Sequence, residues 1–300
     1  MREVRWERMF RDELEAAYAA CPVVYFAYGL CEPHGPQNAL GLDALKAHAI
    51  CVEAAKAHGG VVAPPDYWHI HDVGGYGLWA RQHVGEVERP WMTSVPPWHH
   101  FKNVLYHIRA AEFQRFKAAI LLTGHYGPNW NDLKDMVALI QPHVGVRLAS
   151  FPDFECNTPG FDEDGQSGGD HAGKVETSLL AALEPECVDV TRLPEKTEDM
   201  VAPFAMGPNA HETDRRVGER MVRDEVRFLG ERAGELLAAY DELRPEHAMR
   251  TFAQTERVWS EVVHPKLPEF MTLRDNWHGD EMPEDSVWAE NWPIGEIPPG

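Results

Sequence analysis

Short apolar runs alternate along this chain with longer segments in which apolar residues recur every three or four positions. The runs at 22–30 (PVVYFAYGL) and 118–123 (AAILLT) have the length and composition of buried strands. Longer segments, such as the Ala-rich stretch 42–58 that ends at Gly59 and Gly60, have the period of helices. The pattern predicts strands over 22–30, 61–63, 118–123, 144–150 and 187–190, and helices over 8–20, 42–58, 98–117, 129–141, 171–183 and 213–244.

The order of these elements indicates the fold class. Strands that alternate with helices form a mostly parallel sheet with helices on both faces, which is an α/β fold. In such sheets, ligands bind beyond the carboxyl ends of the strands. Polar residues that directly follow a predicted strand are therefore the first candidates for a functional site.

Two stretches depart from the alternation. Residues 64–97 are rich in Gly, Pro, His and Trp, and loops of that length inside compact domains are usually functional. Residues 251–300 combine acidic residues and prolines with four tryptophans. These are Trp259, Trp277, Trp288 and Trp292. We expect one domain over 1–250 and an ordered arm over 251–300 that packs on this domain or on a neighbouring subunit; a disordered tail is the alternative.

Composition narrows the class of protein. The 300 residues suffice for a sizeable core, and 44% of them are hydrophobic. A formal net charge of −20 argues against nucleic acid as a partner, because such a surface repels phosphate. The five cysteines are scattered without CxxC spacing, and no apolar run resembles a membrane span or a signal peptide. We therefore expect a soluble cytoplasmic protein that acts on a small molecule and contacts neither nucleic acid nor membrane.

Carboxylate and imidazole side chains are concentrated where predicted strands end and predicted helices begin. They are Glu32, His34 and Asp43 after the strand 22–30, His125 after the strand 118–123, and His171 and Glu176 in the helix 171–183. Five of them have an ordinary explanation. Glu32 and His34 can be solvated or hydrogen-bonded, Asp43 can cap a helix, His125 can be a hydrogen-bonded core histidine, and Glu176 can face solvent. The whole set is harder to explain in this way, since buried Glu and His are costly unless something neutralises and orients them.

These side chains suit a hydrolytic metal site. Zinc, manganese and iron accept imidazole nitrogen and carboxylate oxygen, and two such ions about 3.5–4 Å apart can share one carboxylate and one water. Bound water becomes a nucleophile near neutral pH, while a metal polarises the carbonyl under attack. An uncoordinated histidine nearby can supply the proton that the leaving group needs. We therefore predict a metal-dependent hydrolase.

Three motifs make a resemblance to one known family specific. They are Glu-x-His-Gly-Pro with an Asp nine residues after the His, Gly-His-x-x-x-Asn after a strand, and His-Ala-Gly-x-x-Glu-Thr-Ser. In this order and spacing, residues 23–183 resemble the creatininase (creatinine amidohydrolase) family. The resemblance implies a three-layer αβα sandwich around the mostly parallel sheet, assembled into a homo-oligomer such as a hexamer.

The resemblance also implies a dinuclear site. Glu32 and His125 would hold the first metal ion, and His34 and Glu176 the second. Asp43 would bridge the two ions. Zinc is the first expectation for both, with manganese or iron as alternatives, because this ligand set accepts all three.

Further roles carry over to residues beside these ligands. His171 corresponds to the family's uncoordinated histidine, which moves a proton between nucleophile and leaving group. Tyr126 and Asp170 would contact the substrate.

One position departs from creatininase itself. There the sequence resembles Gly-His-Tyr-Glu, and that Glu binds the first metal, whereas this chain has Gly127. Other members resemble Gly-His-Gly-Gly-Asn; their activities include deformylation of a formamidopyrimidine, trimming of a peptide-derived cofactor precursor and opening of a cyclic polyol ketone. We expect hydrolysis of a small, cyclic amide other than creatinine. The alternatives are hydrolytic carbon–carbon ring opening of an inosose-like ketone, and a degenerate site in a non-catalytic ligand-binding or assembly protein.

The segment 64–97 and the residues after it add histidines and aromatic residues. The histidines are His69, His71, His99 and His100, and the aromatic residues are Trp68, Tyr76, Trp79, Trp91 and Trp98. The histidines either form a third metal site or line the pocket, with the rest on the surface. The aromatic residues suggest a lid that stacks on a flat ring or a sugar-like face and excludes water.

Overall fold

A four-stranded parallel sheet forms the centre of the computed structural model. The structure describes residues 3–71, 76–127, 129–157, 170–195, 203–241, 245, 248–273, 283–289 and 297–300. The strands are β1 (Val23–Tyr28), β2 (Val61–Val62), β3 (Ala118–Thr123) and β4 (Arg147–Pro152). They lie in the order β2-β1-β3-β4, and every neighbouring pair is parallel. The carboxyl ends of β1 and β3 coincide, since Tyr28 pairs with Thr123.

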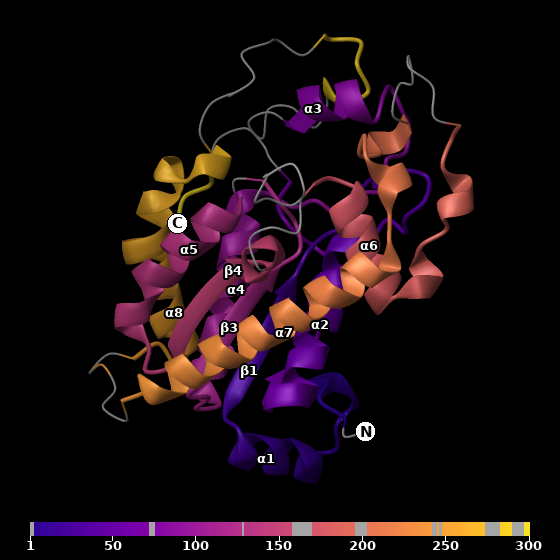
Figure 1. The fold of residues 1–300 in the computed structure, drawn as a ribbon. Helices are drawn as coiled ribbons and strands as arrows, with labels where there is room; N and C mark the ends of the chain where they lie inside the picture. The colour runs from indigo at the N-terminus through magenta and orange to yellow at the C-terminus, as the bar shows by residue number, and fades with distance from the viewer. Residues whose placement is uncertain are drawn as a thin grey trace.

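Helices cover both faces of this sheet. Alternate residues of β1 point to opposite sides, so Phe26 packs with one group of helices and Tyr25 with another. The first group contains α1 (Arg11–Ala20), α4 (Pro97–Phe113), α5 (Asn129–Ile140) and α8 (Phe252–Val258). The second contains α2 (Leu42–His58), α7 (Arg215–Ala238) and, packed against both, α6 (Lys174–Leu183). Figure 1 shows α7, in orange, crossing the strands on the side of α2. The predicted α/β fold, a three-layer αβα sandwich with a parallel central sheet, is confirmed.

Short helical segments connect or extend these elements. The helix α3 (Tyr76–His83) lies within the stretch 64–97 that the sequence predicted as a loop. The 3-10 helices are Trp6–Arg8, Gln141–His143, Asp153–Cys156, Pro185–Cys187, Val190–Arg192, Pro203–Ala205, Ala210–Glu212, His264–Glu269 and Met271–Leu273, and Trp259–Val263 is a π-helix.

The strand predicted over 187–190 is wrong. This stretch consists of two 3-10 turns around Val188, whose single antiparallel bridge joins Asn38 rather than the sheet. The side chain of Asp189 accepts a hydrogen bond from the Thr191 amide at 3.1 Å, which stabilises a turn. A short apolar run forms a strand only where a sheet edge is within reach. Here the backbone of residues 187 and 189 bonds to the loop 37–39 instead.

The stretch 251–300 packs on the chain's own core in its described part. Val258, Trp259 and Val263 are buried in the same cluster as residues of α4 and α5. Trp288 is buried as well, and its Nε1 donates a hydrogen bond to the Gly85 carbonyl at 2.9 Å. Trp277 and Trp292 lie outside the described residues. The domain boundary at residue 250 and a contact with a neighbouring subunit stay predictions.

Helix length and hydropathy bear on membrane insertion. In the part of the chain that the structure describes, no helix is both long enough and apolar enough to cross a bilayer.

Candidate metal centre

Two glycines let the first turn of α2 lie against the carboxyl ends of β1 and β3. A Cβ atom at Gly29, just after β1, would clash with the backbone of Asp43 and Ala44. A Cβ atom at Gly124, just after β3, would clash with the Asp43 carbonyl. Because both positions lack a side chain, Asp43 lies where the two central strands end.

Asp43 faces a different histidine with each of its carboxylate oxygens. Its Oδ1 lies 3.0 Å from His34 Nε2, and its Oδ2 lies 3.1 Å from His125 Nδ1. Glu32 Oε1 lies 3.1 Å from His125 Nδ1 and 3.5 Å from His34 Nε2. All four side chains are buried. The structure therefore brings these four predicted site residues together from β1, α2 and β3.

Glu176 reaches the same cluster from α6. Its Oε2 lies 4.0 Å from His34 Nε2 and accepts a hydrogen bond from the Ala172 amide at 2.8 Å. Its Oε1 pairs with the buried Lys46 ammonium at 2.5 Å. The possible ligand atoms of His34, Asp43 and Glu176 all lie within 4.8 Å of one another.

The donor set fits a divalent cation. His34 Nδ1 donates a hydrogen bond to the Glu32 carbonyl at 3.0 Å, so the neutral ring turns its Nε2 lone pair toward three carboxylates. Such an arrangement is repulsive unless a proton or a cation lies between them. His34 Nε2 and both Glu32 carboxylate oxygens are buried, and the groups that face them are other histidines and carboxylates of the same cluster. A cation that accepts imidazole and carboxylate ligands would satisfy all these atoms.

The charges in the cluster shift one another's pKa values strongly. Burial by itself would lower the pKa of His34, but the carboxylates, Asp43 first, outweigh it and raise this pKa to about 9. Burial would raise the pKa of Asp43, but His34 and His125 lower it to about 2. The pKa of Glu32 is likewise held well below its usual value, because His71 and His125 outweigh burial. At neutral pH Glu32 and Asp43 are therefore ionised, and binding of a metal by His34 would release the proton of this ring.

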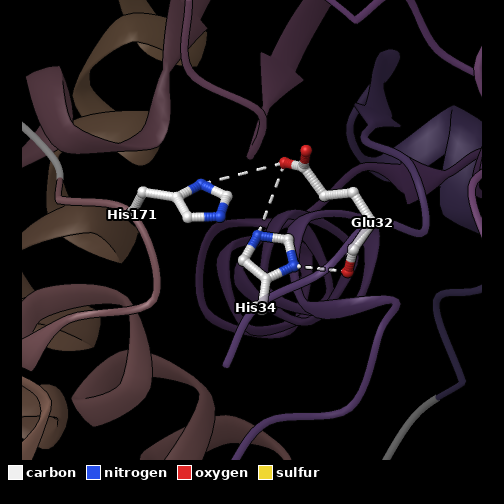
Figure 2. A group of neighbouring side chains, drawn as sticks. All are labelled: Glu32, His34 and His171. Carbon is white, nitrogen blue, oxygen red and sulfur yellow. Dashed lines mark hydrogen bonds and ion pairs between the residues drawn. The ribbon is translucent and has the colours of Figure 1, made fainter. Parts of the chain in front are cut away.

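His171 lies at the edge of the cluster and is partly open to solvent. Its ring stacks on that of His34, with centroids 4.6 Å apart, and 30% of its side chain is exposed. Figure 2 shows both rings turned toward the carboxylate of Glu32, where His171 Nδ1 lies 4.0 Å from Oε1. His171 Nε2 donates a hydrogen bond to the Pro33 carbonyl at 2.9 Å.

The two predicted substrate contacts have structural partners. Tyr126 accepts a hydrogen bond from the Lys46 ammonium at 2.8 Å. Asp170 accepts hydrogen bonds from the amides of Val175 and Glu176, at 2.8 and 3.0 Å, and so caps the first turn of α6. Contact of either residue with substrate stays a prediction.

Two buried residues at the site were not among the predicted ligands. His71, which the sequence placed among residues that either line the pocket or bind a third metal, lies with its Nε2 2.6 Å from Glu32 Oε2. Lys46 neutralises both Glu176 and Asp153, at 2.5 and 3.2 Å. The sequence offered one signal for each residue. For His71 it was the alternation with His69 in a Gly-rich loop, and for Lys46 it was a lysine on an Ala-rich helix.

The other histidines of this region form no metal site with carboxylates in the described part of the chain. His69 and His100 are buried, with ring centroids 4.0 Å apart, and belong to no group of three possible ligands. His99 is exposed. Of the aromatic residues, Trp68 and Trp91 are 58% and 64% exposed. The side chains of Tyr76 and Trp79 lie outside the described residues.

Buried histidines and carboxylates that converge beyond the carboxyl ends of parallel strands define a metal-dependent hydrolase of the α/β class. The family model of creatininase, described as creatinine amidohydrolase, matches residues 7–224. The chain belongs to the creatininase family and is a metal-dependent hydrolase.

Solved structures agree with this assignment at the level of the fold. The crystal structure of creatinine amidohydrolase (creatininase) is 21% identical, covers 78% of this chain and 98% of its own, and has a TM-score of 0.61. A creatininase structure described as the Mn form matches with the same values. A creatininase mutant described as Zn-Zn type matches at 21% identity over 78% of this chain and 98% of its own, with a TM-score of 0.59. No curated protein sequence matches the chain.

Proposed function

We propose that the protein hydrolyses a small cyclic amide at a centre of two divalent metal ions. The observation that carries this proposal is the position of Asp43, whose Oδ1 faces His34 and whose Oδ2 faces His125. A carboxylate in this position is what a pair of ions about 3.5–4 Å apart requires as a bridge. Glu32 and His125 would hold one ion, and His34 and Glu176 the other.

Zinc and manganese are the proposed ions. Imidazole nitrogen and carboxylate oxygen suit both. Family structures are described as Mn and Zn-Zn forms, which supports the same pair of metals here. When bound, the ions supply a water of lowered pKa and polarise the carbonyl under attack.

His171 is the proposed proton carrier. The Pro33 carbonyl can only accept a hydrogen bond, so His171 Nε2 carries the proton in the neutral ring. Nδ1 is then the nitrogen that takes up a proton from the nucleophile and delivers it to the leaving nitrogen. The stacking on His34 and the bond to Pro33 hold the ring in this orientation. Tyr126, which Lys46 orients, and Asp170 are proposed to contact the substrate.

Carbon–carbon ring opening of a cyclic polyol ketone is the second candidate. Gly127 is the reason for considering it, because this position beside Tyr126 has no side chain where creatininase itself has a metal-binding Glu. Its φ of 106° also makes it a poor position for any residue with a Cβ atom.

Metal analysis and product analysis together test the proposal. Protein purified without chelator should contain up to two ions of zinc or manganese per chain and should open cyclic amides, releasing a carboxylate and an amine. Acid products from inosose-like ketones, with no amide hydrolysed, would replace the first candidate by the second. Metal content near zero after addition of zinc or manganese would contradict both and favour a non-catalytic binding protein.

A further inference from the structure

Hydrogen bonds and packing anchor residues 69 and 70 beside the end of β1. The His69 amide donates a hydrogen bond to the Thr93 carbonyl at 3.3 Å, and the His69 carbonyl accepts one from Val95 at 2.9 Å. Thr93 in turn bonds to Cys31, with its amide on the Cys31 carbonyl at 3.1 Å and its hydroxyl accepting from the Cys31 amide at 2.8 Å. Ile70 is fully buried in the main core. These contacts place residue 71, the next along the chain, close to Glu32.

The side chain of His71 turns into the cluster. It is 8% exposed, and its Nε2 lies 2.6 Å from Glu32 Oε2, while Oε1 of the same carboxylate faces His125. The rings of His71 and His125 have centroids 4.9 Å apart. The possible ligand atoms of Glu32, His71 and His125 all lie within 4.8 Å of one another. Two imidazoles and one carboxylate thus converge on one point.

The first metal position has three protein ligands in the proposed centre. Glu32, His125 and the shared Asp43 supply three, and Gly127, which follows His125 closely, has no side chain to add. His171 is a weaker candidate, because it is partly exposed and shares no group of ligand atoms with His125.

We infer that His71 is a protein ligand of the first metal ion, a role that rests on the proposed metal centre. The first ion then has four protein ligands: Glu32, His71, His125 and the shared Asp43. The second has three: His34, Glu176 and Asp43. Four ligands are typical of a closed zinc site and three of an open one. The first ion should therefore bind more tightly, and the second should carry the exchangeable position for water and substrate.

Graded chelation of the zinc-loaded enzyme tests this role. In His71→Gln the affinity for the more tightly bound zinc ion should fall by about 100-fold or more. Loss of a group that only hydrogen-bonds a metal ligand already lowers metal affinity by about 10–100-fold. His69→Gln is the matched control, because His69 is also buried in the same segment but belongs to no ligand group. It should leave the tight ion in place. Unchanged zinc affinity in His71→Gln, or an equal loss in both variants, would overturn the inference.

A spectroscopic variant identifies the ligand directly. His71→Cys loaded with Co²⁺ should gain thiolate-to-cobalt charge-transfer absorption that the wild type and His69→Cys lack. Absence of this band in a folded, cobalt-loaded His71→Cys, together with unchanged zinc affinity in His71→Gln, would overturn the inference.

Asp43→Asn separates this inference from the proposed function. If it loses both ions while His71→Gln keeps both, the metal centre stands and the role of His71 is wrong. If Asp43→Asn, His71→Gln and the wild type all retain the same zinc, the bridged centre is wrong, and the inference that rests on it is overturned too.

Discussion

At the scale of single residues, the sequence leaves two interpretations of Asp43, a helix cap or a metal ligand, and the structure favours the second. An Asp at the start of a helix is commonly a cap. Here the N-cap of α2 is Gly41, without a side-chain cap, and the Asp43 carboxylate is turned to His34 and His125. Contacts across the fold, rather than the position in the helix, decide which interpretation holds.

The division between metal ligands and proton carrier predicts the behaviour of His171→Ala. Turnover should fall by about 10²–10⁴-fold, the usual contribution of a positioned acid–base group. Metal content should stay at the wild-type level, because His171 is not among the proposed ligands. Activity assays and metal analysis of the same preparation check both parts. Loss of metal together with activity would assign His171 to the ligands instead.

At the scale of elements, the turn before α6 links the helix to the metal centre. The helix begins at Lys174 rather than at the predicted residue 171, because residues 170–173 form a turn in which Ala172 has a φ of 50°. Asp170 caps this helix, and the Ala172 amide binds Glu176 Oε2. The same turn therefore holds His171 and Glu176 in place.

Asp170→Ala should weaken both the helix and the second metal position. Loss of the cap costs about 1 kcal/mol of unfolding free energy. Because the side chain of Glu176 is then less firmly positioned, affinity for the more weakly bound ion should fall by about 10–100-fold. Chemical denaturation and zinc titration measure the two effects. Asp214→Ala, which removes the cap of α7, is the control. It should lower the unfolding free energy by a similar amount without changing zinc affinity. An equal loss of zinc affinity in both variants would contradict the connection between the turn before α6 and the metal position.

At the scale of the whole molecule, buried ionisable groups continue from the candidate metal centre into the layer of α7. Glu225 of α7 is fully buried, and burial, with the charge of Asp153 added, raises its pKa well above the usual value. Burial raises the pKa of Asp153 to about 6, against the opposing effect of Lys46. Assembly of this acidic chain into a homo-oligomer stays a prediction at the same scale.

Glu225→Gln should remove part of the pH dependence of stability. A raised folded-state pKa means that the folded chain keeps a proton which the unfolded chain releases above about pH 4.5, so wild-type stability falls as pH rises from there to the folded-state pKa. The slope is at most about 1.4 kcal/mol per pH unit for one group. The free energy of unfolding, measured by urea denaturation of the metal-free proteins, should be the same for variant and wild type near pH 4.5. At pH 8 it should be larger for the variant. Glu231→Gln, exposed on the same helix, controls for net charge. A difference in unfolding free energy between variant and wild type that stays constant from pH 4.5 to pH 8 would contradict the raised pKa of Glu225.

Local patterns in the sequence determined the parallel sheet, its covering helices and the kinds of ligand at the strand ends. Those patterns depend on neighbours a few positions apart, which is why 118–123 and 42–58 were predictable. The strand predicted at 187–190, the start of α6 and the place of His71 depend on segments far apart in the chain. Only packing decided them: a strand needs a partner edge, and His71 meets Glu32 because Thr93 and Ile70 fix its segment there.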